Sequence, residues 1–155
     1  MIIDTYKRGI VKIQNVYFSD KILNSEVDVV RYYQCKTIRQ GGEIFHTNII
    51  DLSLNYNEIQ NRFRHTFRNY IKQARKRYNI KAKMVFAPSY SEVRKFCKAF
   101  DVIANEKKIS GSNEDKLKRM HKNILISYAY IDDVILARHL YIFDASRIRL
   151  LHSCL

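Results

Sequence analysis

Two apolar runs near the end of the chain constrain the fold most. They are Ile124 to Tyr130 (ILISYAY) and Val134 to Phe143 (VILARHLYIF), and the turn-forming pair Asp132 and Asp133 lies between them. β-Branched and aromatic residues on both sides of a short turn predict a β-hairpin. Because the runs are almost continuously apolar, we expect both strands to be central in a sheet and buried on both faces.

The residues that precede the hairpin predict a strand followed by a helix. Residues 80–87 (IKAKMVFA) alternate between polar and apolar types and end at Pro88, the only proline, which indicates a strand. Ser89 and Glu92 have the spacing of a capping box, in which two side chains satisfy free N–H groups at a helix start. The apolar stripe of the expected helix consists of Val93, Phe96, Cys97, Phe100 and Ile103.

Shorter elements follow on both sides of the hairpin. Residues 110–113 predict a loop, and residues 114–122 predict a short helix that turns Leu117 and Met120 inward. Residues 147–152 (RIRLLH) fit either another strand or a short helix.

The first third of the chain has strand patterns at residues 10–18, 27–33 and 44–52. Turn-like residues 20–25 and the pair Gly41 and Gly42 separate them. We expect a small antiparallel β unit here.

The period then changes to three or four residues. A capping-box pair, Asn55 and Glu58, is followed by an apolar stripe that predicts one long helix. The stripe consists of Ile59, Phe63, Phe67, Ile71, Ala74 and Tyr78.

Length and composition predict one compact domain of the α/β (α+β) class. The chain has 155 residues, of which 46% are hydrophobic, so a sizeable core is expected. We expect a mixed, mostly antiparallel sheet flanked by helices, in a single domain 1–155 made of an N-terminal β unit, 1–53, and a second part, 54–155.

Cysteine usage and the N-terminal residues indicate where in the cell the protein is located. Three cysteines, Cys35, Cys97 and Cys154, form an odd set without C-x-x-C spacing, which favours reduced thiols over disulfides or a zinc site. The first ten residues contain Asp4, Lys7 and Arg8 and no apolar signal region, and no apolar run is long enough to span a membrane. We therefore expect a cytoplasmic protein.

The charge indicates an anionic partner. Lys and Arg number 28 against 15 Asp and Glu, a formal net charge of +13, which is compatible with nucleic acid, an anionic membrane face or a phosphorylated small molecule. Residues 62–77 contain seven cations and no acid. The candidate anion-binding residues are Arg64, Arg68, Lys72, Arg75 and Lys76, the first four of which share one flank of the expected helix. Either a bound polyanion relieves their repulsion, or they form a solvated face whose charges pair with acids elsewhere.

The catalytic candidates are His139, His152, Tyr128 and Tyr141. A histidine can act as a general base near neutral pH, and a tyrosine hydroxyl can donate to a leaving group, although ordinary packing explains each of them as well. The histidines lack metal-ligand spacing, so no metal site is expected. The sequence also lacks the G-x-S-x-G, Walker and G-x-G-x-x-G patterns of common hydrolases, NTPases and dinucleotide-binding proteins.

The order of elements from residue 80 onward resembles the first half of the GNAT acyl-CoA N-acyltransferase fold. The segment DLSLNYNEIQNRFRHTFRNYIKQARKRYNIKAKM is similar to part of the FemABX-type aminoacyl transferases, in which a strand ending in aspartate precedes a helix with an R-x-x-I-x-x-A-x-K pattern. Here that pattern consists of Arg68, Ile71, Ala74 and Lys76.

The resemblance implies transfer of an acyl or aminoacyl group to an amine in the assembly of cell-surface polysaccharide or envelope. It implies acyl-CoA or aminoacyl-tRNA as donor, with backbone groups of the strand after the hairpin at the thioester. The glycine-rich loop that holds the CoA pyrophosphate in GNAT enzymes has no counterpart, so we expect a GNAT-like fold that is truncated before this loop, is inactive or needs a partner, and associates with itself through a free sheet edge. The alternative is a non-catalytic module that binds RNA or another polyanion through helix 62–77.

Overall fold

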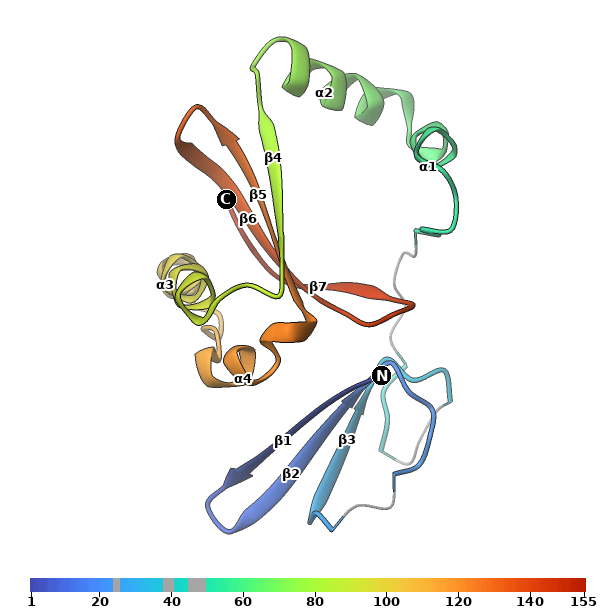
Figure 1. The fold of residues 1–155 in the computed structure, drawn as a ribbon, viewed down its shortest axis with the longest axis vertical. Helices are drawn as coiled ribbons and strands as arrows, with labels where there is room; N and C mark the ends of the chain where they lie inside the picture. Colours follow the sequence, from blue (N-terminus) through green and yellow to red (C-terminus); the bar gives the residue numbers. More distant parts are fainter. Residues whose placement is uncertain (24–25, 38–40, 45–49) are drawn as a thin grey trace.

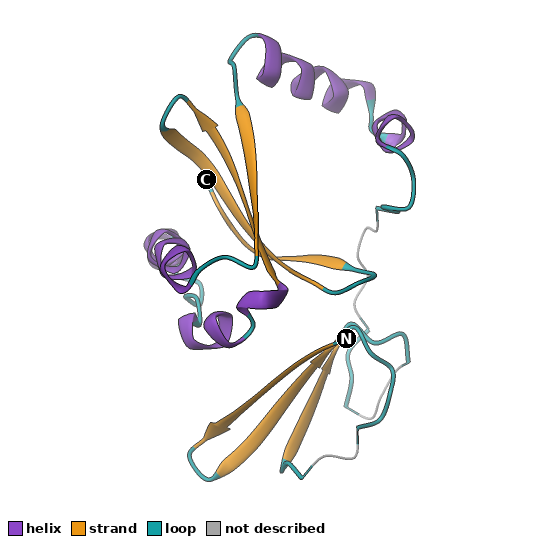
Figure 2. Cartoon of the chain, in the orientation of Figure 1, coloured by secondary structure: helices purple, strands orange, loops and turns teal. Residues whose placement is uncertain are grey.

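The computed structural model describes residues 1–23, 26–37, 41–44 and 50–155, and it has the expected α+β class. The described residues form two sheets, one of three strands and one of four, and four α-helices (Figures 1 and 2). None of the helices in this described part is long and apolar enough to cross a membrane.

The first sheet contains β1 (Ile2–Arg8), β2 (Val11–Tyr17) and β3 (Val29–Tyr33), in that order. The strands expected at 10–18 and 27–33 are confirmed, whereas β1 was not predicted. β1 and β2 are antiparallel, but β2 and β3 are parallel, so the expectation of an antiparallel unit is wrong for this pair. Of the strand expected at 44–52, residues 45–49 lie outside the described residues, and 44 and 50–52 are not in a strand; residues 24 and 25 of the expected turn also lie outside the described part.

Two helices, and not one, occupy residues 56–76. They are α1 (Tyr56–Arg62), which starts at the predicted capping box of Asn55 and Glu58, and α2 (His65–Lys76). The chain is extended at the residues between them, Phe63 and Arg64. A side chain bonds to a carbonyl near this break, since Arg68 Nη1 donates to the Asn61 carbonyl at 3.5 Å. Neither helix has a buried residue. The expectation of a single long helix is therefore wrong.

The second sheet has the order β4-β5-β6-β7 and is antiparallel throughout. Its strands are β4 (Lys81–Phe86), β5 (Ile124–Ile131), β6 (Val134–Phe143) and β7 (Ile148–Cys154). The predicted hairpin is confirmed as β5 and β6, with a turn at Asp132 and Asp133. Of the segment 147–152, which fitted either a strand or a helix, residues 148–152 belong to strand β7.

Within the described ranges, helices cover one face of the second sheet and not the other. On that side lie α3 (Tyr90–Glu106), α4 (Glu114–Arg119) and a short 3-10 turn, His121–Asn123 (Figure 1). β5 and β6 are central, as expected, but the large apolar residues Val134, Ile135 and Leu136 are exposed. The expectation that both strands are buried on both faces is therefore wrong.

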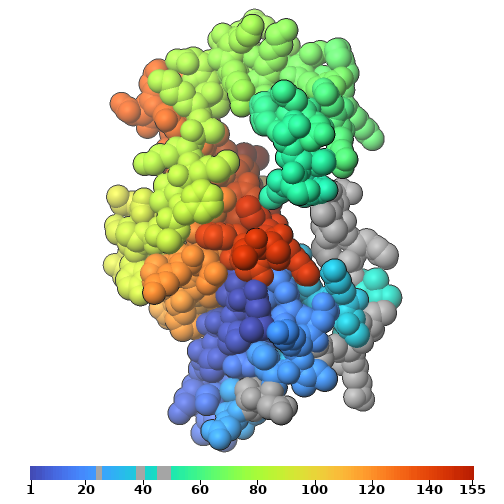
Figure 3. All heavy atoms as spheres, turned by 45° about the vertical axis from the view of Figure 1, so that its right-hand side comes forward, coloured from blue at the N-terminus to red at the C-terminus, as the bar shows by residue number. Residues whose placement is uncertain are grey.

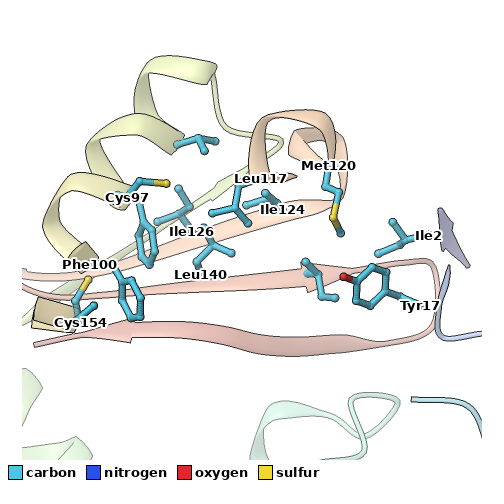
Figure 4. Close-up of a cluster of buried hydrophobic side chains, with 14 of the residues drawn as sticks. Ile2, Tyr17, Cys97, Phe100, Leu117, Met120, Ile124, Ile126, Leu140 and Cys154 are labelled. Carbon is cyan, nitrogen blue, oxygen red and sulfur yellow. The ribbon is translucent and has the colours of Figure 1, made fainter. Parts of the chain in front are cut away.

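The hydrophobic core lies between the covered face and the two helices. Figure 4 shows Cys97 and Leu117 on the helix side, above Ile126 and Leu140 of the sheet. The predicted capping box of Ser89 and Glu92 starts α3. The buried residues of α3 are Val93, Phe96, Cys97, Phe100 and Ala104, which confirms the predicted stripe with Ile103 partly buried.

The core continues into the first sheet. Ile2, Tyr17 and Phe18 belong to the same buried cluster as the residues of α3 and α4. Lys116 of α4 lies over the rings of Tyr17 and Tyr33, at 5.4 and 5.9 Å from their centroids. The two sheets thus share one hydrophobic cluster.

Candidate functional site

The uncovered face of the second sheet carries a short polar row across three strands. Strand register places Ser127 of β5 opposite His139 of β6, and His139 opposite Ser153 of β7. Ser153 Oγ lies 2.9 Å from His139 Nδ1, which fixes the imidazole ring and leaves its Nε2 atom free for another partner. Because β-strand side chains alternate between faces, all three residues point away from α3.

Tyr141 lies on the same open face, two residues along β6. The centroids of the Tyr141 and His139 rings are 6.3 Å apart. Apolar side chains surround these polar groups, among them Met84 and Phe86 of β4, both more than half exposed. Two of the four predicted catalytic candidates therefore lie together on an accessible surface.

The other two candidates lie on the opposite face, beneath α3. The His152 ring packs against Phe100, with 4.5 Å between ring centroids, and burial lowers the pKa of its imidazole below the ordinary value. Tyr128 packs against the same core, and burial raises the pKa of its hydroxyl. The sheet thus separates the Tyr128 and His152 pair from His139 and Tyr141, so the four cannot form one site.

β7 forms an edge of the second sheet and contains a bulge. Leu140 pairs with His152, whereas Tyr141 pairs with Leu150, so Leu151 is the extra residue. Bulges re-aim side chains and are frequent next to active sites. No strand in the described part of the chain pairs with the outer side of β7, so its outward backbone groups can bind a ligand.

The predicted anion-binding residues lie on α2 and at its N-cap. Arg64, Lys72, Arg75 and Lys76 are exposed, and Arg68 is half-buried. Among the described residues, none of the cations at 62–77 lies within 4.0 Å of a carboxylate. The expected pairing with acids elsewhere is therefore not found.

Two hollows lie along these helices. One, of about 370 Å³, is lined by Gln60 and by the α2 residues Arg68, Asn69, Ile71, Lys72, Arg75 and Lys76. The other, of about 510 Å³, has an apolar lining of Ile50, Leu54, Ile59, Phe63 and Phe67. Arg62 and Arg64 complete it together with Asp51.

The residues next to α4 do not fit the pyrophosphate of coenzyme A. Such a group needs free backbone N–H groups in a glycine-rich turn. Gly111 precedes α4, but a Cβ placed there would lie 3.0 Å from Asp101 Oδ1, and the same carboxylate oxygen accepts the Ser112 N–H at 2.7 Å. The Ser112 N–H is therefore already bonded to an acid and is not free for a phosphate. The described residues also contain no cluster of three or more His, Cys, Asp or Glu that could hold a metal ion.

No sequence pattern marks Ser127 or Ser153 as functional residues. Single serines without a glycine-rich turn carry no signal, and their proximity to His139 depends on strand register over 12 and 14 residues. The pattern of a serine on each neighbouring strand becomes visible only once the pairing is known.

Comparisons with known proteins leave the family open. No protein-family model matches the chain, and a search among curated proteins finds no match. The likeness to GNAT and FemABX proteins thus stays a resemblance.

Proposed function

We propose that the chain is an acyltransferase-like protein of GNAT and FemABX type, which transfers an acyl or aminoacyl group to an amine in the assembly of cell-surface polysaccharide or envelope. The observation that carries this proposal is the topology of the second half. A strand, two helices on one face and three antiparallel strands follow one another, in the order that the resemblance implies. The R-x-x-I-x-x-A-x-K residues lie on α2, directly before β4.

The open face supplies the chemistry for such a reaction. An amine attacks the acyl carbonyl, the donor's leaving group departs with its electron pair, and a base takes the amine proton. His139 acts as this base through Nε2, because Ser153 holds its Nδ1 atom, and the Tyr141 hydroxyl donates to the developing negative charge. His152 is excluded from this role because it lies under α3.

The test is acyl transfer by the full chain. Acyl-CoA and aminoacyl-tRNA are offered separately with a set of small amines, and the amide product is measured by mass. His139→Gln should lower the rate about 100-fold, the usual contribution of a general base. His152→Leu, on the covered face, should keep it. No product with either donor contradicts the proposal, and equal loss in both variants contradicts the placement on the open face.

A second candidate function follows from the cations on and next to α2, which have no carboxylate within 4.0 Å among the described residues. In this proposal the chain is a non-catalytic module that binds RNA or another polyanion along Arg64, Arg68, Lys72 and Arg75. Each neutralised phosphate releases condensed counterions, so binding should weaken steeply with salt. Affinity for an oligoribonucleotide that stays constant between low and physiological salt contradicts it.

Self-association and a cytoplasmic location complete the proposal. A second chain pairs with the free edge of β7 and not with β4, because Lys81 and Lys83 on β4 discourage edge pairing. Light scattering at tens of micromolar tests this, and a monomer contradicts it. The cytoplasm is supported by Cys35, Cys97 and Cys154, which are all free thiols.

A further inference from the structure

Apolar and cationic side chains are exposed together on the segment 50–76. α1 and α2 have no buried residue, and Phe67 is 55% exposed although it belongs to the apolar stripe of α2. In the space-filling view an open gap lies between part of the green α1–α2 segment and the red strands (Figure 3). The stripe is therefore not part of the core.

The stripe continues into the larger of the two hollows. The rings of Phe63 and Phe67 meet edge to face, 5.5 Å between centroids, and with three aliphatic side chains they form its apolar lining. Arg62 and Arg64 stand beside this lining. Asp51 is the acid at the hollow, and its carboxylate accepts hydrogen bonds from Ser53.

These features match the chemistry of an anionic phospholipid surface. A helix that rests on a bilayer has a strongly charged flank rich in Lys and Arg, aromatic or aliphatic residues on the other side, and low overall hydrophobicity. α2 has this division: none of the described carboxylates lies within 4.0 Å of Arg68, Lys72 or Arg75, and Phe67 is more than half exposed. Anionic headgroups attract each cation near the surface, and the acyl region takes up the apolar side chains.

We propose that α1 and α2 dock on a phospholipid bilayer that contains anionic lipids. The cations at 64, 68, 72 and 75 contact headgroup phosphates, and Phe67 and the adjacent apolar lining enter the interface. The second candidate function assigns RNA or another polyanion to these four cations, and this inference assigns a lipid surface to them instead. It is independent of acyl transfer. Lipid is favoured over nucleic acid because a phosphate backbone would neutralise the cations but leave Ile50, Leu54 and Ile59 in water.

The chain contains no tryptophan, which allows a direct test. Phe67→Trp places one fluorophore on the stripe, and Val102→Trp, at a residue of α3 that is 58% exposed, is the matched control. Each full-length variant is mixed with vesicles of phosphatidylcholine alone or with phosphatidylglycerol added. We expect a blue shift and quenching by lipids brominated in the acyl chain only for Phe67→Trp and only with phosphatidylglycerol.

The electrostatic part is tested in the Phe67→Trp background. Each cation near an anionic surface contributes about fivefold to binding, so Arg68→Gln with Lys72→Gln should weaken partition about 30-fold. The control pair Lys95→Gln with Lys98→Gln removes the same charge from the exposed side of α3 and should change partition less than twofold. All four substituted residues are outside the core cluster, and circular dichroism verifies the fold.

Three results would overturn the inference. The first is Phe67→Trp emission that stays as in buffer when anionic vesicles bind, since the stripe then remains in water. The second is an equal weakening of vesicle partition by the two double variants, since binding would then depend on the net charge of the protein and not on α2. The third is tight binding of an oligouridylate without partition to vesicles, which would assign the cations at 64, 68, 72 and 75 to nucleic acid. Acyl transfer is assayed without vesicles, so its failure is recognised separately.

Discussion

At the residue scale, the ion pair of Asp4 and Arg119 is asymmetric. The Asp4 side chain has no exposed surface, whereas 38% of the Arg119 side chain is exposed. Arg119 Nε lies 2.7 Å from Asp4 Oδ1, and Asn15 Nδ2 donates to Oδ2 at 3.2 Å. Loss of the cation would leave a buried charge with one neutral partner, while loss of the acid would leave a cation that can turn to water.

Arg119→Met should therefore lower the free energy of unfolding by about 3 kcal/mol, in the range for a broken buried pair. Asp4→Asn should cost less, on the order of 1 kcal/mol, because it leaves only an imperfect hydrogen bond. Urea unfolding at pH 7 measures both. Arg94→Met, which breaks an exposed pair with Glu114, is the control and should cost about 0.5 kcal/mol. Similar values for Arg94→Met and Arg119→Met would show that the burial of Asp4 has no energetic effect.

His152 should make stability depend on pH. Burial, with a smaller effect of Lys116, lowers the pKa of its imidazole in the folded state below the ordinary value of 6.5. As pH falls through 6.5, the unfolded chain binds a proton that the folded chain does not bind. The free energy of unfolding therefore decreases with falling pH, until the pH reaches the lower pKa of the folded state.

Urea unfolding at pH 7.5 and 5.5 should thus show a smaller difference for His152→Leu than for the parent chain. His65→Gln, on the exposed face of α2, is the control and should keep the parent's difference. The same pH difference in His152→Leu and the parent would contradict the role of burial.

The sequence predicted some of the buried and paired residues and not others. The prediction of the apolar stripe of α3 was correct because helical spacing is a local property of the sequence. A stripe of this kind packs on whichever sheet face is next to it. The Asp4 and Arg119 pair and the Ser153 and His139 contact could not be predicted, since they depend on pairing between segments 115 and 14 residues apart.

At the element scale, local signals were strongest at helix starts. Both predicted capping boxes, at Asn55 and at Ser89, have the reciprocal bonds that the spacing indicates. The break between α1 and α2 has no glycine or proline to mark it. The apolar period continues across the break, so periodicity alone predicts one helix. The chain is free to break there because no tertiary packing holds either helix straight.

α1 and α2 should exchange their amide hydrogens faster than α3 does. Neither has a buried residue, whereas α3 has five, and local opening is cheapest where few apolar contacts are lost. Hydrogen exchange of the full chain without lipid measures this. Exchange in α2 as slow as in α3 would show that α2 packs against another element.

Charge repulsion within α2 should add to this faster exchange, and a charge reversal tests its contribution. Lys72→Glu replaces two like-charge neighbours, Arg68 and Lys76 at i−4 and i+4, by two favourable pairs, worth about 1 kcal/mol together. Exchange in α2 should slow about fivefold, while the matched change Lys98→Glu on α3 should leave α2 unchanged. Faster exchange in Lys72→Glu would mean that the cations are not repelling one another.

At the scale of the whole molecule, α4 joins the two sheets. Arg119 bonds to β1, Lys116 lies over rings of β2 and β3, and Leu117 and Met120 enter the shared core. β1 was not predicted because Asp4, Lys7 and Arg8 make its sequence polar. The parallel pairing of β2 and β3 was not predicted either, since alternation indicates a strand but not its direction.

The shared core predicts that the two sheets unfold together. A three-stranded sheet is marginal alone, and here Ile2, Tyr17 and Phe18 belong to the same buried cluster as residues of α3, α4 and the second sheet. Hydrogen exchange in increasing urea should therefore give one midpoint for peptides from β2 and from α3. Arg119→Met should lower both midpoints by the same amount, and Arg94→Met should lower both by a much smaller amount. If β2 loses protection at lower urea than α3, the N-terminal β unit is an independent domain, and the link through α4 does not couple the two sheets.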